Sequence, residues 1–297
     1  MSQVFAEDVG APEGPVFAAD GTFFIVEMAG DRTSLTRLSK EGRTVVATTA
    51  GRPNGLACDG DGNLWVAEAH EGAVLCFAPD GKLLGKIAGD KDGRFLWPND
   101  LAFGPDGLLY LTDSGVLDDD FIDGQAIRSD FRDMPFDGRV YRIDPARGEV
   151  LDVIDRGLRF TNGIAFDPQG ILHVNETLSG NVYRYADDAG GRTVREVYAN
   201  VLHGLDDGNF RGPDGMKFDR DGRLYCAVYG QQEVTVIGPS GQIERRLKTR
   251  GSKPTNLAFA PGGTAIYVTE VETSSVEIIE VGAPGLPLHC PSLRAAA

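Results

Sequence analysis

The chain has 297 residues, and its 29 basic and 44 acidic side chains give a formal net charge of −15. An acidic chain without a Lys/Arg cluster repels the phosphate backbone, so nucleic acid is excluded as an expected partner. No run approaches the roughly 20 apolar residues of a membrane-spanning helix, and the N-terminal segment lacks the charged and apolar regions of a secretion signal. We therefore expect a cytoplasmic protein without a membrane partner.

The four cysteines lie far apart and form no C-x-x-C pair. Neither a zinc site nor a disulfide framework is indicated by this spacing. We expect Cys58, Cys76 and Cys226 to be small buried side chains, and Cys290 to be a free thiol near the C-terminus.

One pattern recurs six times along the chain: a polar residue, a short apolar run, a turn with glycine, and a second apolar run rich in β-branched and aromatic residues. Each copy is predicted to be a β-hairpin. The copies are EGPVFAADGTFFIVE from Glu13, NGLACDGDGNLWVAE from Asn54, NDLAFGPDGLLYLTD from Asn99, NGIAFDPQGILHVNE from Asn162, DGMKFDRDGRLYCAV from Asp214 and TNLAFAPGGTAIYVTE from Thr255. Positive φ is expected at the turn glycines, which are Gly21, Gly62, Gly107, Gly170, Gly222 and Gly263.

Two further strand-like runs follow each of the first five hairpins. Four strands per unit, repeated every 41 residues (13 to 54) to 63 residues (99 to 162), are typical of β-propeller blades. The sixth unit is one strand short, and QVFAEDV at the start of the chain can complete it, which removes the open sheet edges. The sequence therefore predicts an all-β fold, a six-bladed β-propeller over residues 1–283 with an irregular tail over 284–297. An open pair of β-sheets would explain neither the six repeats nor the short last unit.

The first strand of each propeller blade lies innermost, so the residues that open these strands converge on the central axis at one face. This column consists of Glu13, Asn54, Asn99, Asn162, Asp214 and Thr255. Two carboxylates in such a ring repel each other unless a cation lies between them. A set of oxygen donors without thiolate or imidazole suits Ca²⁺, Mg²⁺ or Mn²⁺ better than zinc. For Asn54, capping of the strand through a local hydrogen bond to the backbone is an alternative.

The sixth member of the column depends on the alignment. Matching the apolar triplet 257–259 to 101–103 selects Thr255, whereas counting back from Glu270 selects Asn256. We follow the triplet because it sets which face each side chain takes.

A second set of acids follows the column at the end of the second strand of each hairpin. Its members are Glu27, Glu68, Asp113, Glu176 and Glu270, with Val228 in the fifth repeat. These carboxylates could orient the inner residues, or they could cap the loops between blades and be solvated.

EGPVF at Glu13, ND at Asn99, TNGIAF at Asn162 and PDGM at Asp214 resemble the senescence marker protein, gluconolactonase and luciferin-regenerating enzyme family. The resemblance runs from about residue 5 to residue 280. It implies a six-bladed propeller with one catalytic divalent cation on the axis, and hydrolysis of sugar-acid lactones.

By this resemblance, Glu13, Asn162 and Asp214 are the metal ligands, and Asp214 is the general base that accepts a proton from water. Asn99 faces the substrate near or at the metal. Regucalcin-like members carry Arg where this chain has Trp97. A sugar ring can stack on Trp97, but the cationic donor is lost at that position.

Two loops on the same face are candidates for substrate contact. His203, in the loop of residues 200–213, could contact substrate or shuttle protons, or it could be a loop residue without a role. The segment of residues 114–138 breaks the repeat and carries Phe121, Phe131, Met134 and Phe136 among its acids. We predict that it forms a lid over the pocket.

The expected function is therefore metal-dependent hydrolysis of an aldonolactone or a similar small lactone, by a monomer or a small homo-oligomer. Ca²⁺ is the expected metal, with Zn²⁺, Mn²⁺, Mg²⁺ and Fe²⁺ as alternatives. A phosphotriesterase-like hydrolase on the same metal centre is a second hypothesis. A third is a non-catalytic binding propeller with a structural cation, or a pseudoenzyme related to strictosidine synthase.

Overall fold

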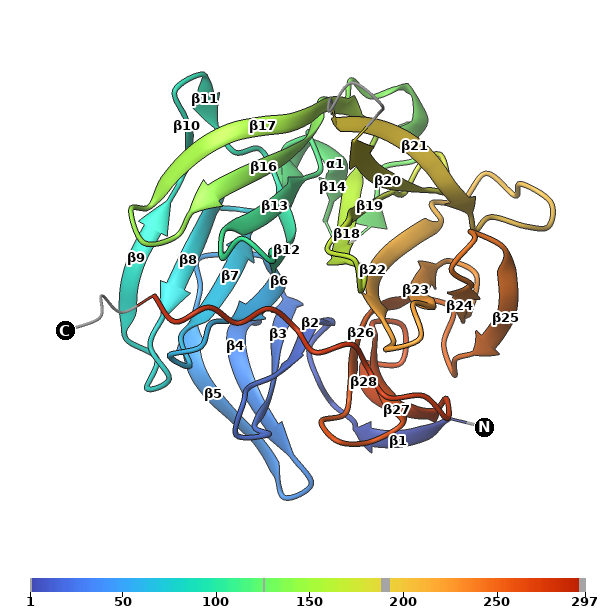
Figure 1. Cartoon of the computed structure of the whole chain (residues 1–297), viewed down its shortest axis with the longest axis horizontal. Coiled ribbons are helices and arrows are strands. Elements are labelled where there is room, and N and C mark those ends of the chain that lie inside the picture. Colours follow the sequence, from blue (N-terminus) through green and yellow to red (C-terminus); the bar gives the residue numbers. More distant parts are fainter. Residues whose placement is uncertain (1, 125, 188–192, 294–297) are drawn as a thin grey trace.

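The computed structural model describes residues 2–124, 126–187 and 193–293. In this part of the chain, six four-stranded antiparallel sheets are arranged in a ring around a central axis (Figure 1). The six-bladed β-propeller predicted from the repeats is confirmed. No helix among the described residues is long and apolar enough to cross a membrane.

The blades follow one another in chain order, and within each blade the strands run from the axis outward. Blade 1 contains β2 (Pro12–Phe17), β3 (Phe23–Ala29), β4 (Arg32–Ser39) and β5 (Gly42–Thr48), and blade 2 contains β6 (Pro53–Cys58), β7 (Leu64–Glu68), β8 (Ala73–Phe77) and β9 (Leu83–Ile87). Blade 3 contains β12 (Pro98–Phe103), β13 (Leu109–Asp113), β16 (Gly138–Asp144) and β17 (Glu149–Leu158), and blade 4 contains β18 (Thr161–Phe166), β19 (Leu172–Glu176), β20 (Asn181–Asp187) and β21 (Thr193–Asn200). Blade 5 contains β22 (Gly212–Phe218), β23 (Leu224–Tyr229), β24 (Glu233–Ile237) and β25 (Ile243–Lys248).

Blade 6 is completed by the N-terminal strand, as predicted. It contains β26 (Pro254–Phe259), β27 (Ala265–Glu270), β28 (Ser275–Glu280) and β1 (Gln3–Ala6). β1 pairs antiparallel with β28, so that Gln3 faces Ile278. The ring is therefore closed by main-chain hydrogen bonds between its two ends, and the outer edge of β28 is covered.

The hydrophobic core lies between neighbouring blades. Trp65 of blade 2 packs edge-on against Phe103 of blade 3, with ring centroids 6.2 Å apart. Inner strands approach so closely that some positions accept only glycine: a Cβ on Gly55 would come within 2.5 Å of the Cα of Asp100. Three cysteines are buried in these contacts and Cys290 is exposed, as expected, with all four thiols free.

The hairpin turns confirm five of the six expected turn glycines. The first five have φ between +78° and +86°. In the sixth hairpin, Gly262 takes the left-handed conformation, not Gly263. The extra residue in this turn moves the position that needs a positive φ by one residue.

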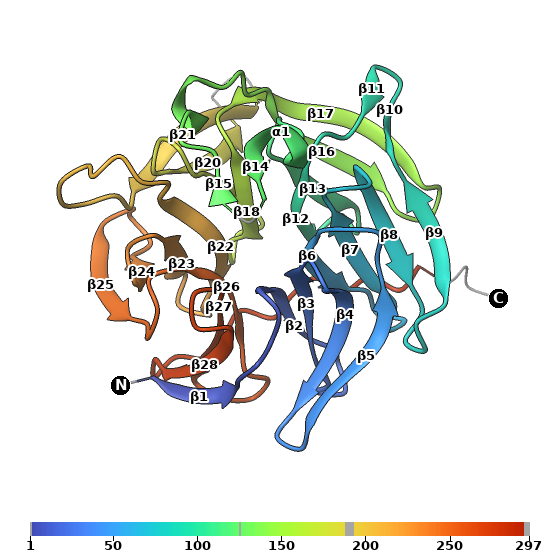
Figure 2. The same ribbon diagram turned by 180° about the vertical axis from the view of Figure 1, so that it is seen from behind.

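The two faces of the ring carry different segments (Figure 2). The residues between β13 and β16 form the short helices α1 (Asp118–Phe121) and η1 (Phe131–Asp133) and the small hairpin of β14 (Ile122–Asp123) and β15 (Ala126–Ile127) on one face. Another small hairpin, β10 (Gly89–Asp90) and β11 (Gly93–Arg94), follows β9.

The C-terminal segment crosses the opposite face, in front of the blades in Figure 1. The Leu286 N–H donates to the Phe218 carbonyl (2.9 Å) and the Gly60 N–H donates to the Pro291 carbonyl (2.8 Å). Leu286 and His289 also line an apolar cavity of about 50 Å³ on the axis. The segment therefore connects blade 2 to blade 5 through main-chain hydrogen bonds. The division of the chain at residue 283 stays a prediction.

Phe5 tests the closure of the ring. Its ring packs edge-on against Phe23 (5.7 Å between centroids) and Tyr267 (5.0 Å), so it joins blades 6 and 1. Phe5→Ala is expected to lower the free energy of unfolding by about 2 kcal/mol, less than the roughly 3–5 kcal/mol of a fully buried aromatic side chain, because Phe5 is only partly buried. Lys40→Ala, in an exposed turn, is the control. Equal stability of the two variants in urea denaturation would contradict the role of β1.

Candidate functional site

The residues that open the inner strands meet at the face that carries the 114–138 segment. Glu13 is only 3% exposed, whereas Asp214 keeps intermediate exposure. Burial, followed by the charges of Asp214 and Asp100, raises the pKa of Glu13 well above its ordinary value. Burial and then the charge of Asp100 raise the pKa of Asp214. Three carboxylates thus share one poorly solvated space, which favours a bound cation.

The amides of Asn99 and Asn162 are oriented by hydroxyl groups. The Nδ2 of Asn99 donates to Ser114 Oγ (3.0 Å), and the Nδ2 of Asn162 donates to Thr177 Oγ1 (3.1 Å). Both hydroxyls donate their own protons to backbone carbonyls, of Thr161 and Pro213 respectively. Each hydroxyl must therefore accept from the amide nitrogen, which fixes the amide orientation.

This orientation leaves two oxygens without partners. The Oδ1 atoms of Asn99 and Asn162 are buried and have no hydrogen-bond donor among the described residues. A buried carbonyl oxygen without a partner is costly, so each such oxygen calls for an explanation. Together with the carboxylates of Glu13 and Asp214, they form an all-oxygen donor set that fits a hard divalent cation.

Asp100 and Asn256 are axial residues that the sequence analysis did not place in the ring: Asp100 was not considered, and Asn256 was set aside in favour of Thr255. They are the third residues of opposite inner strands, β12 and β26, and each directly follows a ring residue. The Leu101 N–H donates to Asp100 Oδ1 and the Leu257 N–H donates to Asn256 Oδ1, both at 2.8 Å. The Nδ2 of Asn256 donates to Glu13 Oε1 (3.3 Å). The signal in the sequence is that the other four repeats carry glycine here: Gly14, Gly55, Gly163 and Gly215.

The sixth blade corrects the expectation for Thr255. The alignment itself is right, because Pro254 pairs with Glu270 as Pro98 pairs with Asp113. However, the Thr255 hydroxyl donates to the Pro12 carbonyl (3.0 Å), so it joins blades 6 and 1. Asn256, the rejected alternative, is the side chain that contacts Glu13.

Asn54 lies in the ring and is nearly buried. Among the described residues, its side chain has no hydrogen bond that caps the strand, and Ala69 stands where Ser114 holds Asn99. The predicted capping role is therefore not seen.

The second set of acids caps the loops that enter the inner strands. Glu68 accepts from the Arg52 N–H, Asp113 accepts from the Trp97 N–H (3.0 Å), and Glu270 accepts from the Lys253 N–H (2.8 Å). The capping alternative is thus confirmed for these acids, but the expectation that they are solvated is wrong. The five carboxylates of Glu27, Glu68, Asp113, Glu176 and Glu270 are buried.

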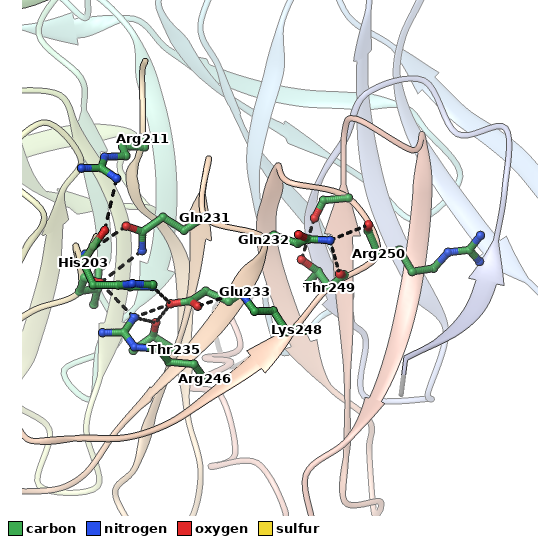
Figure 3. Close-up of polar contacts among 12 residues, drawn as sticks. His203, Arg211, Gln231, Gln232, Glu233, Thr235, Arg246, Lys248, Thr249 and Arg250 are labelled. Atoms are coloured by element: carbon green, nitrogen blue, oxygen red, sulfur yellow. Dashed lines mark hydrogen bonds and ion pairs between the residues drawn. The ribbon is translucent and has the colours of Figure 1, made fainter. Parts of the chain in front are cut away.

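His203 is held by Glu233 on the outer part of blade 5 (Figure 3). Its Nε2 lies 3.2 Å from Glu233 Oε1, and Arg246 Nη1 donates to the same oxygen. Burial raises the pKa of Glu233, but the hydrogen bonds from Arg246 and Thr235 outweigh burial and the net shift is downward. None of the described hydrogen bonds of His203 involves a member of the axial ring. The predicted substrate contact of His203 has no support in this geometry and stays a prediction.

The segment of residues 114–138, hereafter the lid, packs over Trp97. Phe121 lies 5.6 Å from Trp97 and 4.9 Å from Phe160, measured between ring centroids. Phe131 contacts Phe210 at 5.5 Å. Trp97 is only 4% exposed as a result. A sugar ring can therefore stack on Trp97 only if the lid side chains move.

The lid is tied to blade 2 by an ion-pair cluster. His70 Nδ1 lies 3.1 Å from Asp118 Oδ2, and Arg52 Nε lies 3.9 Å from the same oxygen. His70, Asp118 and Asp119 could also hold a metal by their proximity. Because the Arg52 guanidinium already faces Asp118, we assign this cluster to lid attachment and not to a cation.

A sequence model described as the SMP-30/Gluconolactonase/LRE-like region matches residues 2–92 and 88–272. The chain belongs to this family.

Individual relatives cover nearly the whole chain. Diisopropyl-fluorophosphatase of Loligo vulgaris is 29% identical over 316 residues, covering 97% of this chain and 94% of the relative. Gluconolactonase of Zymomonas mobilis is 26% identical over 289 residues, covering 90% of this chain and 78% of the relative. The crystal structure of regucalcin, a calcium-binding protein from Agrobacterium tumefaciens, has a TM-score of 0.74 at 20% identity and covers 99% of this chain and 98% of its own, which shows the shared fold.

The family resemblance expected from EGPVF, ND, TNGIAF and PDGM is therefore confirmed. The four residues that carry it, Glu13, Asn99, Asn162 and Asp214, are brought together by the fold. Asn99 has the same oriented amide and the same unpaired oxygen as Asn162.

Lid attachment is expected to depend on pH. The hydrogen bond with Asp118 raises the pKa of His70. Partial burial opposes this shift, and the negative charges of Asp118, Asp119 and Glu68 add to it. The Arg52 guanidinium also faces Asp118. A raised pKa means that the attachment is complete below the ordinary value of about 6.5 and is lost as pH rises through the raised pKa. Amide hydrogen exchange of residues 117–122, corrected for the intrinsic pH effect, should therefore be slower at about pH 6 than at about pH 8.

The His70→Gln variant should lose this pH dependence, whereas His289→Gln, in the C-terminal segment, should keep it. Equal protection at both pH values in the unmodified protein would show that His70 does not hold the lid.

Proposed function

We propose that this protein is a hydrolase that opens small lactones and depends on one divalent cation held on the propeller axis. The observation that carries the proposal is the pair of oriented amide oxygens, of Asn99 and Asn162, set without partners beside the carboxylates of Glu13 and Asp214. The name of the gluconolactonase relative supports lactones as the substrate class.

Glu13, Asn99, Asn162 and Asp214 would hold the cation. Oxygen ligands suit Ca²⁺ first, and Zn²⁺, Mn²⁺, Mg²⁺ and Fe²⁺ remain alternatives. When bound, the cation supplies Lewis-acid stabilisation for the negative charge that develops on the lactone carbonyl.

Asp214 would act as the general base. Of the two carboxylates in the ring, Asp214 is the more exposed, and its carboxylate can accept a proton from an attacking water. The oriented amides of Asn99 and Asn162 do not ionise in the ordinary pH range, so they serve to bind and orient. Ser114 is not a nucleophile in this arrangement, because its hydroxyl already donates to the Thr161 carbonyl (3.0 Å).

Phosphotriester hydrolysis is a second candidate function. It is favoured by the diisopropyl-fluorophosphatase relative, which matches 97% of this chain. The same axial donor set could serve both carbonyl and phosphoryl substrates, since both develop negative charge on an oxygen.

Hydrolysis of a substrate panel tests the proposal. Proton release would be followed in a pH-stat with aldonolactones, aliphatic lactones and a phosphotriester, before and after chelation. We expect chelator-sensitive turnover of lactones that returns when Ca²⁺ is added. Turnover of the phosphotriester alone would favour the second candidate. Absence of chelator-sensitive turnover on every substrate would favour a non-catalytic binding propeller.

The hydroxyls that orient the amides give a second prediction. Ser114→Ala releases the Asn99 amide, and Thr177→Val releases the Asn162 amide, so both should weaken Ca²⁺ binding by about tenfold or more, as is usual when a partner of a metal ligand is lost. Calorimetric titration of the chelated protein measures this directly. Ser39→Ala, at the exposed end of β4, is the control. Unchanged affinity in both site variants would remove the amides from the binding set.

A further inference from the structure

Each ring residue is preceded, two positions earlier in the sequence, by a residue of a second set that we call the rim. The rim consists of Ala11, Arg52, Trp97, Phe160, Gly212 and Lys253. Three of their backbone N–H groups are held by the buried acids Glu68, Asp113 and Glu270, as described above. The scaffold therefore fixes the backbone of the rim, while its side chains differ from blade to blade.

Arg52 and Trp97 form a contact within this rim. The Cζ of Arg52 lies 5.8 Å from the centroid of the Trp97 ring, so the guanidinium of blade 2 covers the indole of blade 3.

Neither side chain of this pair donates a hydrogen bond within the described chain. The Arg52 side chain is 27% exposed, and among the described residues it donates no hydrogen bond; its one carboxylate neighbour within 4.0 Å is Asp118, at 3.9 Å from Nε. By contrast, Arg139, of similar exposure, donates to both Asp137 and Tyr141. Trp97 Nε1 is buried and also has no acceptor in the described chain. An unpaired buried donor is costly unless a ligand supplies the acceptor.

From these two donors we infer that the rim recognises a carboxylate on the substrate. A sugar diacid keeps one free carboxylate when its other carboxyl group closes the lactone ring. The substrates are therefore lactones of sugar diacids. This inference rests on the proposed lactonase function and specifies its substrate class. The planar fork of Arg matches a carboxylate with two parallel hydrogen bonds. The Trp97 N–H can add a third donor once the Phe121 ring, 5.6 Å away, moves with the lid.

A single negative charge fits this position better than a phosphate. Glu13, Asp100 and Asp214 lie in the neighbouring ring, and Asp118 already faces Arg52, so a dianion would meet stronger repulsion. Lys253, on blade 6, lies with its Nζ 6.0 Å from the Tyr229 ring centroid and adds a second positive charge to the rim.

The test compares two lactones that differ only in the carboxylate. For the unmodified protein with Ca²⁺, we compare kcat/KM for an aldarolactone, which has a free carboxylate, with kcat/KM for the matching aldonolactone. The ratio of the two values should be about tenfold or more, as expected for a charged bidentate hydrogen bond. In Arg52→Met, which keeps the apolar cover of Trp97, this ratio should fall at least tenfold, mainly through KM of the aldarolactone. Trp97→Phe should reduce the ratio less. Arg37→Met, which removes the same charge from an exposed site on β4, should leave the ratio unchanged.

The outcomes separate the two claims. If neither lactone is hydrolysed, the proposed function fails. If the aldonolactone is hydrolysed but the aldarolactone is not preferred, the function stands and the inference is overturned. The inference is also overturned if Arg52→Met and Arg37→Met change the ratio equally, because the effect would then reflect only net charge.

Discussion

The structure depends on the crowding of three carboxylates, of Glu13, Asp100 and Asp214, at one end of the propeller axis. Burial and mutual repulsion raise the pKa values of Glu13 and Asp214. Neighbouring groups relieve this only in part: the Asn256 amide donates to Glu13, and the Leu101 N–H donates to Asp100. The amides of Asn99 and Asn162 add two oxygens without donors to the same space. A hard cation satisfies all of these groups at once, which no hydrogen-bond donor in the described chain does.

The fold separates the parts that hold this site from the parts that select what enters it. Glycines such as Gly55 let the inner strands approach, and hydroxyls such as Ser114 orient the asparagine amides. Buried acids such as Asp113 fix the backbone of the rim. The rim side chains and the lid beyond Ser114 have neither of these tasks.

The sequence was sufficient for the architecture because each blade repeats the same short-range signals. It also predicted Glu13, Asn99, Asn162 and Asp214 as neighbours, since equivalent positions of a ring converge. Asp100 and Asn256 were not predicted, although both interrupt a column of glycines. Thr255 was assigned to the ring because an alignment gives the position of a residue but not the partner of its hydroxyl. Contacts across long loops, such as His203 with Glu233 or Arg52 with Trp97, follow from packing that no local pattern encodes.

The most direct measurement of the central claim is a crystal structure of the protein grown with Mn²⁺, in which anomalous scattering locates the metal. The account predicts one strong anomalous peak on the axis, bounded by the side-chain oxygens of Glu13, Asn99, Asn162 and Asp214. A peak confined to His70, Asp118 and Asp119, or an axial ring in which the two asparagine oxygens accept ordinary hydrogen bonds and no metal binds, would contradict it.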